Sequence, residues 1–360
     1  MGFERLRFYN FRNLKDQELD CRSREVFLVG ENGQGKTNLL EAVHLLSLGS
    51  SFRETRESAF ARDQSTATGL HGWFSSSERG EKTLSLRLTP GRKKEFRVND
   101  KALTERRELL SEVLCISFVQ QDMEFVNGAP EERRKLFDQT LVLSDLSFLD
   151  SLRDYRHVVK ARNLCLKEER EDLLDVYDAQ LSALGLVVQT RRAALVREFD
   201  AVFSPLFSEI TGAEESLHIR YRPSWETLNG VDDVMAHLAA RRARDRLLGS
   251  TTSGPHRDTF SYIQAGKDYA QLASTGQLRL CALVLRVAQT QFLAAGTGRK
   301  PVLLLDDVLL ELDPGRKRAF IARFPPYEQA FFTFLPDESW QSFRTPDTLV
   351  LTVARGDFLR

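Results

Sequence analysis

The sequence predicts an α/β protein with mixed sheets and an inserted, mainly helical lobe. An apolar, strand-like run from Glu25 to Gly30 leads through a glycine-rich segment into a helix pattern from Lys36 to Leu48. Short alternating runs between residues 66 and 98 indicate antiparallel strands, whereas helix formers dominate residues 129 to 248. We therefore expect one discontinuous α/β domain, residues 1–128 and 249–360, around a helical lobe at 129–248.

Further elements follow from local patterns along the chain. Cys115 to Val119 has the composition of a buried strand, and Pro130 suits the first turn of a helix. After residue 249 we expect, in order, the strand TFSYIQA, an apolar helix from Gln277 to about Leu293, the strand PVLLLDD, a helix that opens at Pro314 and the strand AFFTF. Strands that alternate with helices in this way are typical of a parallel sheet.

The composition limits the partners and the location of the protein. Among 360 residues, 51 basic and 51 acidic side chains cancel, so any anionic partner must meet a local patch. The four cysteines form no C-x-x-C pair, which indicates neither a zinc site nor a disulfide framework and favours a reducing compartment. The first residues lack the apolar core of a signal peptide, and no run approaches roughly 18 apolar residues. We expect a cytoplasmic protein with no membrane partner.

The glycine-rich segment fits the phosphate-binding pattern G-x-x-x-x-G-K-[ST], between a strand and a helix as that pattern requires. Backbone N–H groups of such a loop wrap a diphosphate, its lysine neutralises the outer phosphates and its hydroxyl binds Mg²⁺. A glycine turn that only caps the helix is the alternative interpretation. The segment predicts ATP and Mg²⁺ as cofactors, bound by Gly30, Glu31, Asn32, Gly33, Gln34, Gly35, Lys36 and Thr37.

An acid pair ends the apolar run VLLLDD. Asp306 and Asp307 are expected at the carboxyl edge of a buried parallel strand, where ligands collect. Asp306 can hold Mg²⁺, and Asp307 can orient or deprotonate an attacking water. Acidic residues also end apolar strands without any function. The functional interpretation of the pair therefore depends on the presence of the phosphate-binding loop.

A serine and a glycine precede the apolar helix near residue 277. Ser274, Gly276 and Gln277 place a hydroxyl and free N–H groups at a helix start, which is a second anion site. The alternative is an ordinary serine helix cap with a glycine turn. A nucleotide whose phosphates are already held by the glycine-rich loop does not need a second anion site on the same side. We therefore expect the turn at Ser274 to cap a phosphate from the side opposite to that loop.

In their order along the chain, the loop, the Ser-x-Gly-Gln turn and the acid pair resemble the ATP-binding-cassette ATPases. This resemblance implies an ATPase head of that type, in which Ser274, Gly276 and Gln277 act on nucleotide held by a second subunit. It assigns catalytic roles to Lys36, to Asp307 in place of the usual glutamate, and to a glutamine after CISFV, where Gln120 and Gln121 both remain open. Asp313 lies where the subunit-contacting D-loop is expected. The switch histidine is missing, and AFFTF offers Thr333 after the final strand instead.

Three further segments resemble the RecF family within the SMC-like ATPases: LRFYNFRN at the start, GAPEERRKLFD at Gly128 to Asp138 and TTSGPHRD at Thr251 to Asp258. The resemblance places Asn10 and Arg12 near the nucleotide. It implies an ATP-dependent homodimer that binds gapped or junction DNA, hydrolyses ATP slowly, and works with RecR and RecO to load RecA. The segment GPHRD also has a purely structural interpretation. In it, His256 is a packed or capping imidazole, and Arg257 and Asp258 are paired with each other.

DNA contacts would have to come from local basic clusters. Candidates are Arg92-Lys93-Lys94, Arg106-Arg107, Arg133-Arg134-Lys135, Arg153 to Arg162 and Arg241 to Arg246, although each alone is more typical of a solvated or ion-paired face. No stacking platform of aromatic residues stands out in the sequence, which favours duplex or junction DNA over single strands. The main alternative function is the nucleotide-binding subunit of a transporter, without DNA.

Overall fold

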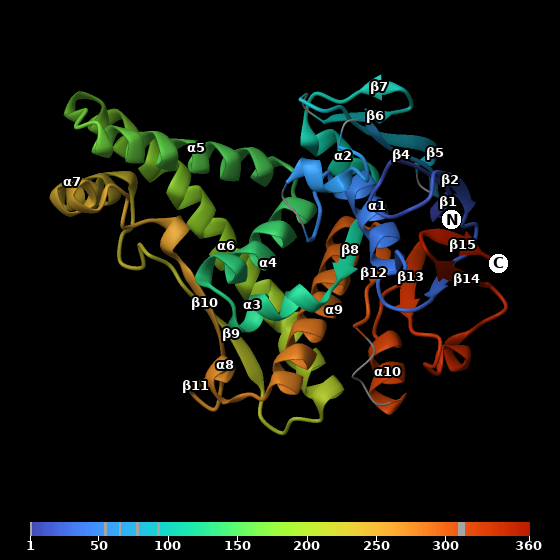
Figure 1. The fold of residues 1–360 in the computed structure, drawn as a ribbon. Helices are drawn as coiled ribbons and strands as arrows, with labels where there is room; N and C mark the ends of the chain where they lie inside the picture. Colours follow the sequence, from blue (N-terminus) through green and yellow to red (C-terminus); the bar gives the residue numbers. More distant parts are fainter. Residues whose placement is uncertain (1, 54–55, 65, 77–78, 92–93, 309–313) are drawn as a thin grey trace. The chain divides into compact units, whose positions relative to one another are not determined.

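The protein is described here by a computed structural model that covers residues 2–53, 56–64, 66–76, 79–91, 94–308 and 314–360 (Figure 1). Its contacts divide the chain into two compact units. Unit 1 comprises Met1–Gln120 and Ala294–Arg360, and unit 2 comprises Gln121–Leu293. The mixed α/β class predicted from the sequence is confirmed, with helices and sheets in both units.

Unit 1 contains two six-stranded sheets. The first is antiparallel and has the strand order β2-β1-β4-β5-β6-β7. Its strands are β1 (Gly2–Tyr9), β2 (Gln17–Asp20), β4 (Thr68–Ser76), β5 (Gly80–Leu88), β6 (Glu95–Val98) and β7 (Lys101–Ala102). The alternating runs between residues 66 and 98 thus form the antiparallel strands that their period of two predicts.

The second sheet of unit 1 is mixed and has the order β15-β14-β3-β13-β12-β8. Four of its five pairings are parallel, and only β15 runs antiparallel to its neighbour. Its strands are β3 (Glu25–Val29), β8 (Cys115–Phe118), β12 (Val302–Leu305), β13 (Gln329–Phe334), β14 (Thr348–Ala354) and β15 (Asp357–Leu359). Because β3, β12 and β13 are parallel neighbours, the segments that follow them lie at one edge of the sheet.

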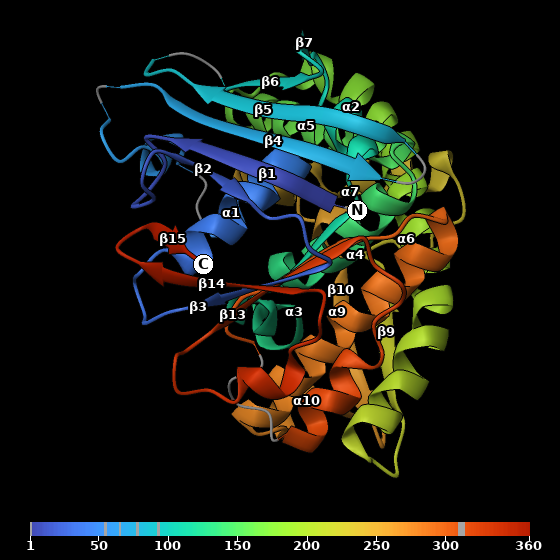
Figure 2. The same ribbon diagram turned by 90° about the vertical axis from the view of Figure 1, so that its right-hand side faces the viewer.

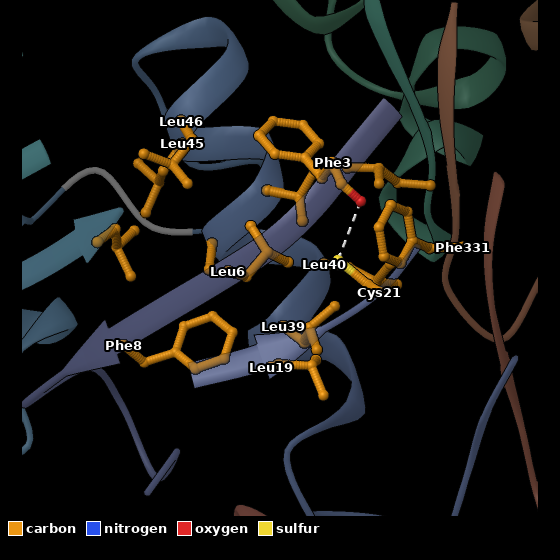
Figure 3. Close-up of a cluster of buried hydrophobic side chains, with 14 of the residues drawn as sticks. Phe3, Leu6, Phe8, Leu19, Cys21, Leu39, Leu40, Leu45, Leu46 and Phe331 are labelled. Carbon is orange, nitrogen blue, oxygen red and sulfur yellow. Dashed lines mark hydrogen bonds between the residues drawn. The ribbon is translucent and has the colours of Figure 1, made fainter. Parts of the chain in front are cut away.

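Helix α1 (Lys36–Leu48) packs between these two sheets. Both sheets therefore share one hydrophobic core. Its leucines pack against Phe3, Leu6 and Phe8 of β1, as Figure 3 shows for Leu39, Leu40, Leu45 and Leu46. The same cluster includes Phe331 of the mixed sheet, and the thiol of Cys21 donates a hydrogen bond of 3.1 Å to the carbonyl of Phe3. Packing on both sides explains why every residue of α1 from Leu39 to Ser47 is buried, polar ones included. Smaller helices α2 (Arg106–Glu112) and α10 (Pro314–Ile321), with 3₁₀ turns at Glu57–Phe60 and Trp340–Phe343, complete the unit.

Unit 2 is mainly helical, with one small antiparallel sheet of the order β11-β10-β9. Its helices are α3 (Glu124–Asn127), α4 (Pro130–Ser144), α5 (Ser147–Lys167), α6 (Leu174–Thr211), α7 (Val231–Leu248), α8 (Tyr269–Leu272) and most of α9 (Thr275–Thr297). Its strands are β9 (Leu217–Arg222), β10 (Thr259–Gln264) and β11 (Lys267–Asp268), and 3₁₀ turns lie at Gln120–Met123, Glu171–Leu173 and Pro255–Arg257.

Unit 2 extends beyond the lobe expected at 129–248 on both sides. The strand TFSYIQA, expected in the nucleotide-binding domain, instead forms β10 and pairs with β9 over six residues. Pairing between segments about forty residues apart cannot be read from a local pattern. The first turns of α9 also belong to this unit.

One helix in the described part of the chain, α9, has the length and apolar composition of a membrane span. The sequence analysis expected none. However, 72% of its most apolar window is buried inside the protein, as in the core helix of a globular unit. All four cysteines are also buried and free.

Candidate nucleotide-binding site

The phosphate-binding loop lies between β3 and the first residue of α1, as predicted. Two of its glycines have backbone angles that other residues rarely adopt, with φ of 76° at Gly33 and 119° at Gly35. Gly30 is required by space, because a Cβ atom there would lie 2.4 Å from the carbonyl oxygen of Val353. The glycines therefore shape a loop whose N–H groups can converge on an anion.

The loop is held in place by the chain around it. Its Gly33 carbonyl accepts a hydrogen bond of 2.9 Å from the side chain of Asn13, and the Gln34 carbonyl accepts one of 2.8 Å from the N–H of Gly356. The buried Lys36 ammonium folds back and donates to the carbonyls of Gly30 and Glu31. Lys36 therefore lies inside the curve of the loop, where an outer phosphate could replace those carbonyls as its acceptor.

The acid pair lies beside this loop, although it is far away in the sequence. Thr37 at the start of α1 donates a hydrogen bond of 2.9 Å from its hydroxyl to the carboxylate of Asp306, 269 positions downstream. Asp306 directly follows β12, and its N–H bonds to the carbonyl of Phe118 in β8. The hydroxyl and the carboxylate are hard oxygen ligands, so this pair fits Mg²⁺.

Asp306 carries an electrostatic penalty that a cation would relieve. Burial, together with the neighbouring charge of Asp307, raises the pKa of Asp306 to about 6, although the hydrogen bond from Thr37 opposes this shift. Neither carboxylate of the pair forms a salt bridge with a described residue, and Arg53 acts on Asp306 only through its charge. Thr37 and Asp306 could therefore hold a divalent cation, which would relieve this penalty.

Asp307 is fixed by a residue of the next strand. Its backbone is left-handed, with φ of 52°, which is uncommon for a residue other than glycine. The hydroxyl of Thr333 in β13 accepts a hydrogen bond of 2.7 Å from the Asp307 N–H and lies 2.8 Å from its carboxylate. Thr333 therefore sits inside β13, not after it as the sequence analysis expected, and its hydroxyl already serves the acid pair.

A charged network surrounds Glu41 of α1. Arg12 makes two hydrogen bonds of 2.9 Å to the fully buried carboxylate of Glu41. Ser51 and Arg53 bond to the same carboxylate at 2.5 and 2.6 Å. Burial raises the pKa of Glu41, but these hydrogen bonds outweigh burial and leave it below its usual value. Arg12 is thus fixed near the first turns of α1, and sequence reasoning missed both Glu41 and Arg53.

Asn10, which the resemblance placed near the nucleotide, has another role. Its buried side chain donates to the carbonyls of Asp63, Thr66 and Ala67 and accepts from the N–H of Asp63. Asn10 itself has a φ of 50°. Its amide therefore closes the loop before β4, and it does not point to the phosphate-binding loop.

Two other expected site elements remain undecided. Gln120 and Gln121 both lie exposed in the 3₁₀ turn after β8, and the described contacts give no reason to prefer one. β8 is the parallel neighbour of β12, so this turn follows the strand beside the acid pair. Asp313, the expected D-loop contact, lies outside the described residues.

The turn before α9 has the geometry of a helix cap. The N–H of Ser274 donates to the Gln277 side chain at 2.8 Å, and the Gln277 N–H donates to the Ser274 hydroxyl at 3.3 Å. Ser274, Gly276 and Gln277 are all exposed. A Cβ atom at Gly276 would meet no other atom within 4 Å, so packing within the chain does not require a glycine there. The alternative interpretation, a serine helix cap, is therefore correct locally.

The chain is similar to known proteins over most of its length. Residues 3–336 match the family described as RecF/RecN/SMC N terminal domain. A relative in Treponema pallidum, a DNA replication and repair protein RecF, is 38% identical over 96% of this chain and 98% of its own. A RecF of Leptospira interrogans is 31% identical over 95% of this chain and 94% of its own. The chain belongs to the RecF family.

Solved structures extend the agreement to the fold. The recombination mediator protein RecF with ATP, from the RecFOR pathway, superposes with a TM-score of 0.89 at 29% identity and covers 100% of this chain and 98% of that one. An Smc head bound to the C-terminal winged-helix domain of ScpA has a TM-score of 0.57 at 16% identity over 99% and 96% of the two chains, and supports the fold alone. Membership in the RecF family decides against the transporter alternative.

Two of the three segments that resemble the RecF family, GAPEERRKLFD and TTSGPHRD, lie in unit 2 and make internal contacts there. Asp258 of GPHRD accepts from the buried Arg192 at 2.9 Å, not from Arg257 as expected, because Arg257 donates to the Thr251 carbonyl. His256 bonds to the Tyr155 hydroxyl and the Thr251 carbonyl, and burial lowers its pKa to about 4. The interpretation of His256 as a packed imidazole is therefore correct. GAPEERRKLFD forms the start of α4, where Arg133 and Arg134 donate to backbone carbonyls of Phe260 and Asp258.

Most basic clusters proposed as DNA contacts also have partners inside the chain. Lys135 pairs with Glu132, Arg153 with two aspartates, and Arg242 with Asp175 and Asp178. Arg107 pairs with Glu105, and Arg92 and Lys93 lie outside the described residues. The described residues of these clusters with ion pairs match the solvated, ion-paired interpretation.

Proposed function

We propose that this protein is an ATP-dependent DNA replication and repair protein. Two copies would close on ATP, bind gapped or junction DNA in the cytoplasm, and work with RecR and RecO to load RecA onto single strands. The observation that carries the ATP-dependent part is the hydrogen bond between Thr37 and Asp306, because it joins the phosphate-binding loop to the acid pair. The DNA-repair part rests on the names of the RecF relatives and on the RecFOR pathway named for the solved neighbours.

The residues of the loop and the acid pair divide the work. The loop from Gly30 to Thr37 would hold the phosphates of ATP, and Thr37 and Asp306 would hold Mg²⁺, which neutralises phosphate charge when bound. Lys36 would donate to the outer phosphates, and Asp307, held by Thr333, would orient or deprotonate water. Arg12 would be held beside the site by its hydrogen bond to Glu41. Gln120 or Gln121 would sense the Mg²⁺ site.

The turn at Ser274 would complete the site of a second copy. Its exposed hydroxyl and the bare backbone at Gly276 suit the approach of a phosphate held by another subunit. Gln277 would keep the serine in place through the reciprocal cap. Because Asp307 is shorter than glutamate and Thr333 is already engaged, water would be positioned less well and hydrolysis would be slow.

Light scattering with ATP and Mg²⁺ tests this function. We expect wild-type protein to dimerise with ATP, Lys36→Arg to lose nucleotide affinity, and Ser274→Arg to bind ATP but stay monomeric. Thr227→Arg, an exposed polar site of unit 2, is the matched control and should dimerise normally. Normal dimerisation of Ser274→Arg would disprove capping by the second subunit.

DNA affinity measured in parallel tests the rest of the proposal. Binding to a gapped duplex should be stronger with ATP than with ADP or no nucleotide, and it should fall as salt rises. Absence of DNA retention under all three nucleotide conditions would reject the DNA-repair role.

A further inference from the structure

The antiparallel sheet of unit 1 has one covered and one open face. Along β1, Leu6 and Phe8 point into the core with α1, whereas Arg5, Arg7 and Tyr9 alternate on the other side. In Figure 2, β1, β4 and β5 face the viewer and α1 lies behind them. Arg7, Arg87 and Arg97 on this side are exposed, and Tyr9 is 51% exposed. We call this side the open face, defined by Arg5, Arg7, Tyr9, His71, Trp73, Arg87 and Arg97.

Strand pairing places rings and guanidinium groups side by side on the open face. In the register of β1 and β4, Arg5 lies opposite Trp73, Arg7 opposite His71, and Tyr9 opposite Gly69. The Arg5 guanidinium is 4.1 Å from the centre of the Trp73 ring, and the His71 and Trp73 rings are 4.2 Å apart. The sequence analysis found no stacking platform because these rings come from two strands about sixty residues apart.

A hollow lies next to Tyr9 where a side chain is missing. Gly69 sits between Tyr9 on β1 and Arg87 on β5, so nothing fills the space above it. The hollow has a volume of about 340 Å³, and its lining includes Tyr9, Gly69, Arg87 and Arg97. That volume lies at the lower end of the range for ligand sites in proteins.

The charge around this hollow is positive. Arg97 is paired with Glu95, and Arg5 is paired with Glu18. Arg7 and Arg87 form no salt bridge with any residue that the structure describes, so their charges are available to an anion. In the strand register Glu18 lies opposite Arg7 and Glu95 opposite Arg87, although their salt bridges are with Arg5 and Arg97. The charge of Asp100 acts on His71, Asp20 is held by Arg22 and Arg360, and Glu81 lies at the other end of β5, opposite Ser75.

We infer that the open face is a binding site for single-stranded nucleic acid. An unpaired base would enter the hollow and stack on Tyr9, while Arg7 and Arg87 contact the flanking phosphates. Sheets that present aromatic side chains in this way stack two or three bases, and stacking on aromatic rings tolerates any base sequence. A duplex cannot insert a paired base into such a hollow, and an acidic peptide would use the arginines but not the ring. The inference deepens the proposed function, on which its biological meaning rests.

Fluorescence anisotropy of a labelled oligothymidylate, measured without nucleotide, tests the site. We expect Tyr9→Ala to weaken binding about tenfold, as for the loss of one stacked base, and Tyr9→Phe to bind like wild type. Arg87→Glu should weaken binding by a similar factor. Arg107→Glu makes the same charge change on α2, where Arg107 pairs with Glu105, and should bind like wild type. Circular dichroism checks the fold of each variant.

Two results would overturn the inference: equal binding by Tyr9→Ala and wild type, or displacement of the oligonucleotide by polyglutamate as effectively as by unlabelled oligothymidylate. The second would indicate an acidic peptide or a general anion. The proposed function is tested separately by ATP-dependent retention of gapped duplex. If that retention is present but single-strand binding ignores Tyr9, only this inference fails; if it is absent but Tyr9-dependent binding persists, only the proposed function fails.

Discussion

Unit 2 balances its buried carboxylates with arginines, and unit 1 does the same at Glu41 but not at the half-buried acid pair of Asp306 and Asp307. In unit 2 the fully buried Arg162 donates to Asp178 at 2.6 Å and to Asp245 at 2.7 Å, and Arg242 also bonds to Asp178. In unit 1 Asp306 and Asp307 lie together with hydroxyl groups of Thr37 and Thr333 and no salt bridge to a described residue. Burial raises the pKa of Asp306 as a result.

This difference distinguishes carboxylates that stabilise the fold from carboxylates that can bind a ligand. A buried carboxylate with an arginine partner is already balanced, so its removal damages the fold. A buried carboxylate without a cation costs stability in the free protein and is retained because a ligand supplies the charge. The comparison therefore supports the proposed role of Asp306 and Asp307 without reference to any relative.

The largest expected effect tests the balanced cluster of unit 2. Arg162→Met leaves the buried Asp245 without its cation and Asp178 with Arg242 alone, and should lower the free energy of unfolding by about 3 to 5 kcal/mol. Urea denaturation measures the loss, and hydrogen exchange should localise it to α5, α6 and α7. Arg170→Met removes an exposed arginine that pairs with Asp172 and should leave the unfolding free energy unchanged. Equal effects of the two substitutions would show that Arg162 does not balance the buried acids.

Asp306→Asn should change the free energy of unfolding in the opposite direction to Arg162→Met. The folded protein binds the proton of Asp306 more tightly than the unfolded chain does, so this group stabilises below about pH 4 and loses that contribution as pH rises through about 6. Removing the charge should therefore raise the unfolding free energy at pH 8, without Mg²⁺ or nucleotide, by about 1 to 3 kcal/mol. The gain should vanish near pH 4, and Mg²⁺ should no longer strengthen ATP binding.

Urea denaturation at both pH values checks this result, with Asp357→Asn as the control. Asp357 is paired with Lys15, and its pKa lies below the usual value, so its replacement should not stabilise the protein at pH 8. A gain for Asp306→Asn that does not depend on pH would contradict the assignment of the penalty to its charge.

The smallest stability effect is expected at Thr333. Thr333→Val keeps the shape but leaves the Asp307 N–H without its acceptor, which should lower the unfolding free energy by about 1 kcal/mol. Because Asp307 would also lose its orientation, kcat for ATP hydrolysis should fall about tenfold while ATP affinity is unchanged. Steady-state kinetics and ATP titration measure the two, and Thr333→Ser should restore both. An unchanged kcat for Thr333→Val would remove Thr333 from the positioning of Asp307.

The sequence alone located the elements that a single local pattern defines. The loop from Gly30 to Thr37, helix α1 from Lys36 and the acid pair after VLLL follow from spacing within one strand, turn or helix. The same patterns predicted the mixed α/β class and the strands between residues 66 and 98. Such signals survive because glycine angles, helix period and strand alternation depend on residues a few positions apart.

Tertiary structure decided every contact whose partners lie far apart in the chain. It paired β10 with β9, gave Asp258 to Arg192 and not to Arg257, and placed the Thr333 hydroxyl on Asp307. It also brought Tyr9 beside a glycine of β4 to leave a hollow that no single segment contains. The physical reason is that a side chain's partner is set by sheet register and packing across the fold, which local propensities do not encode.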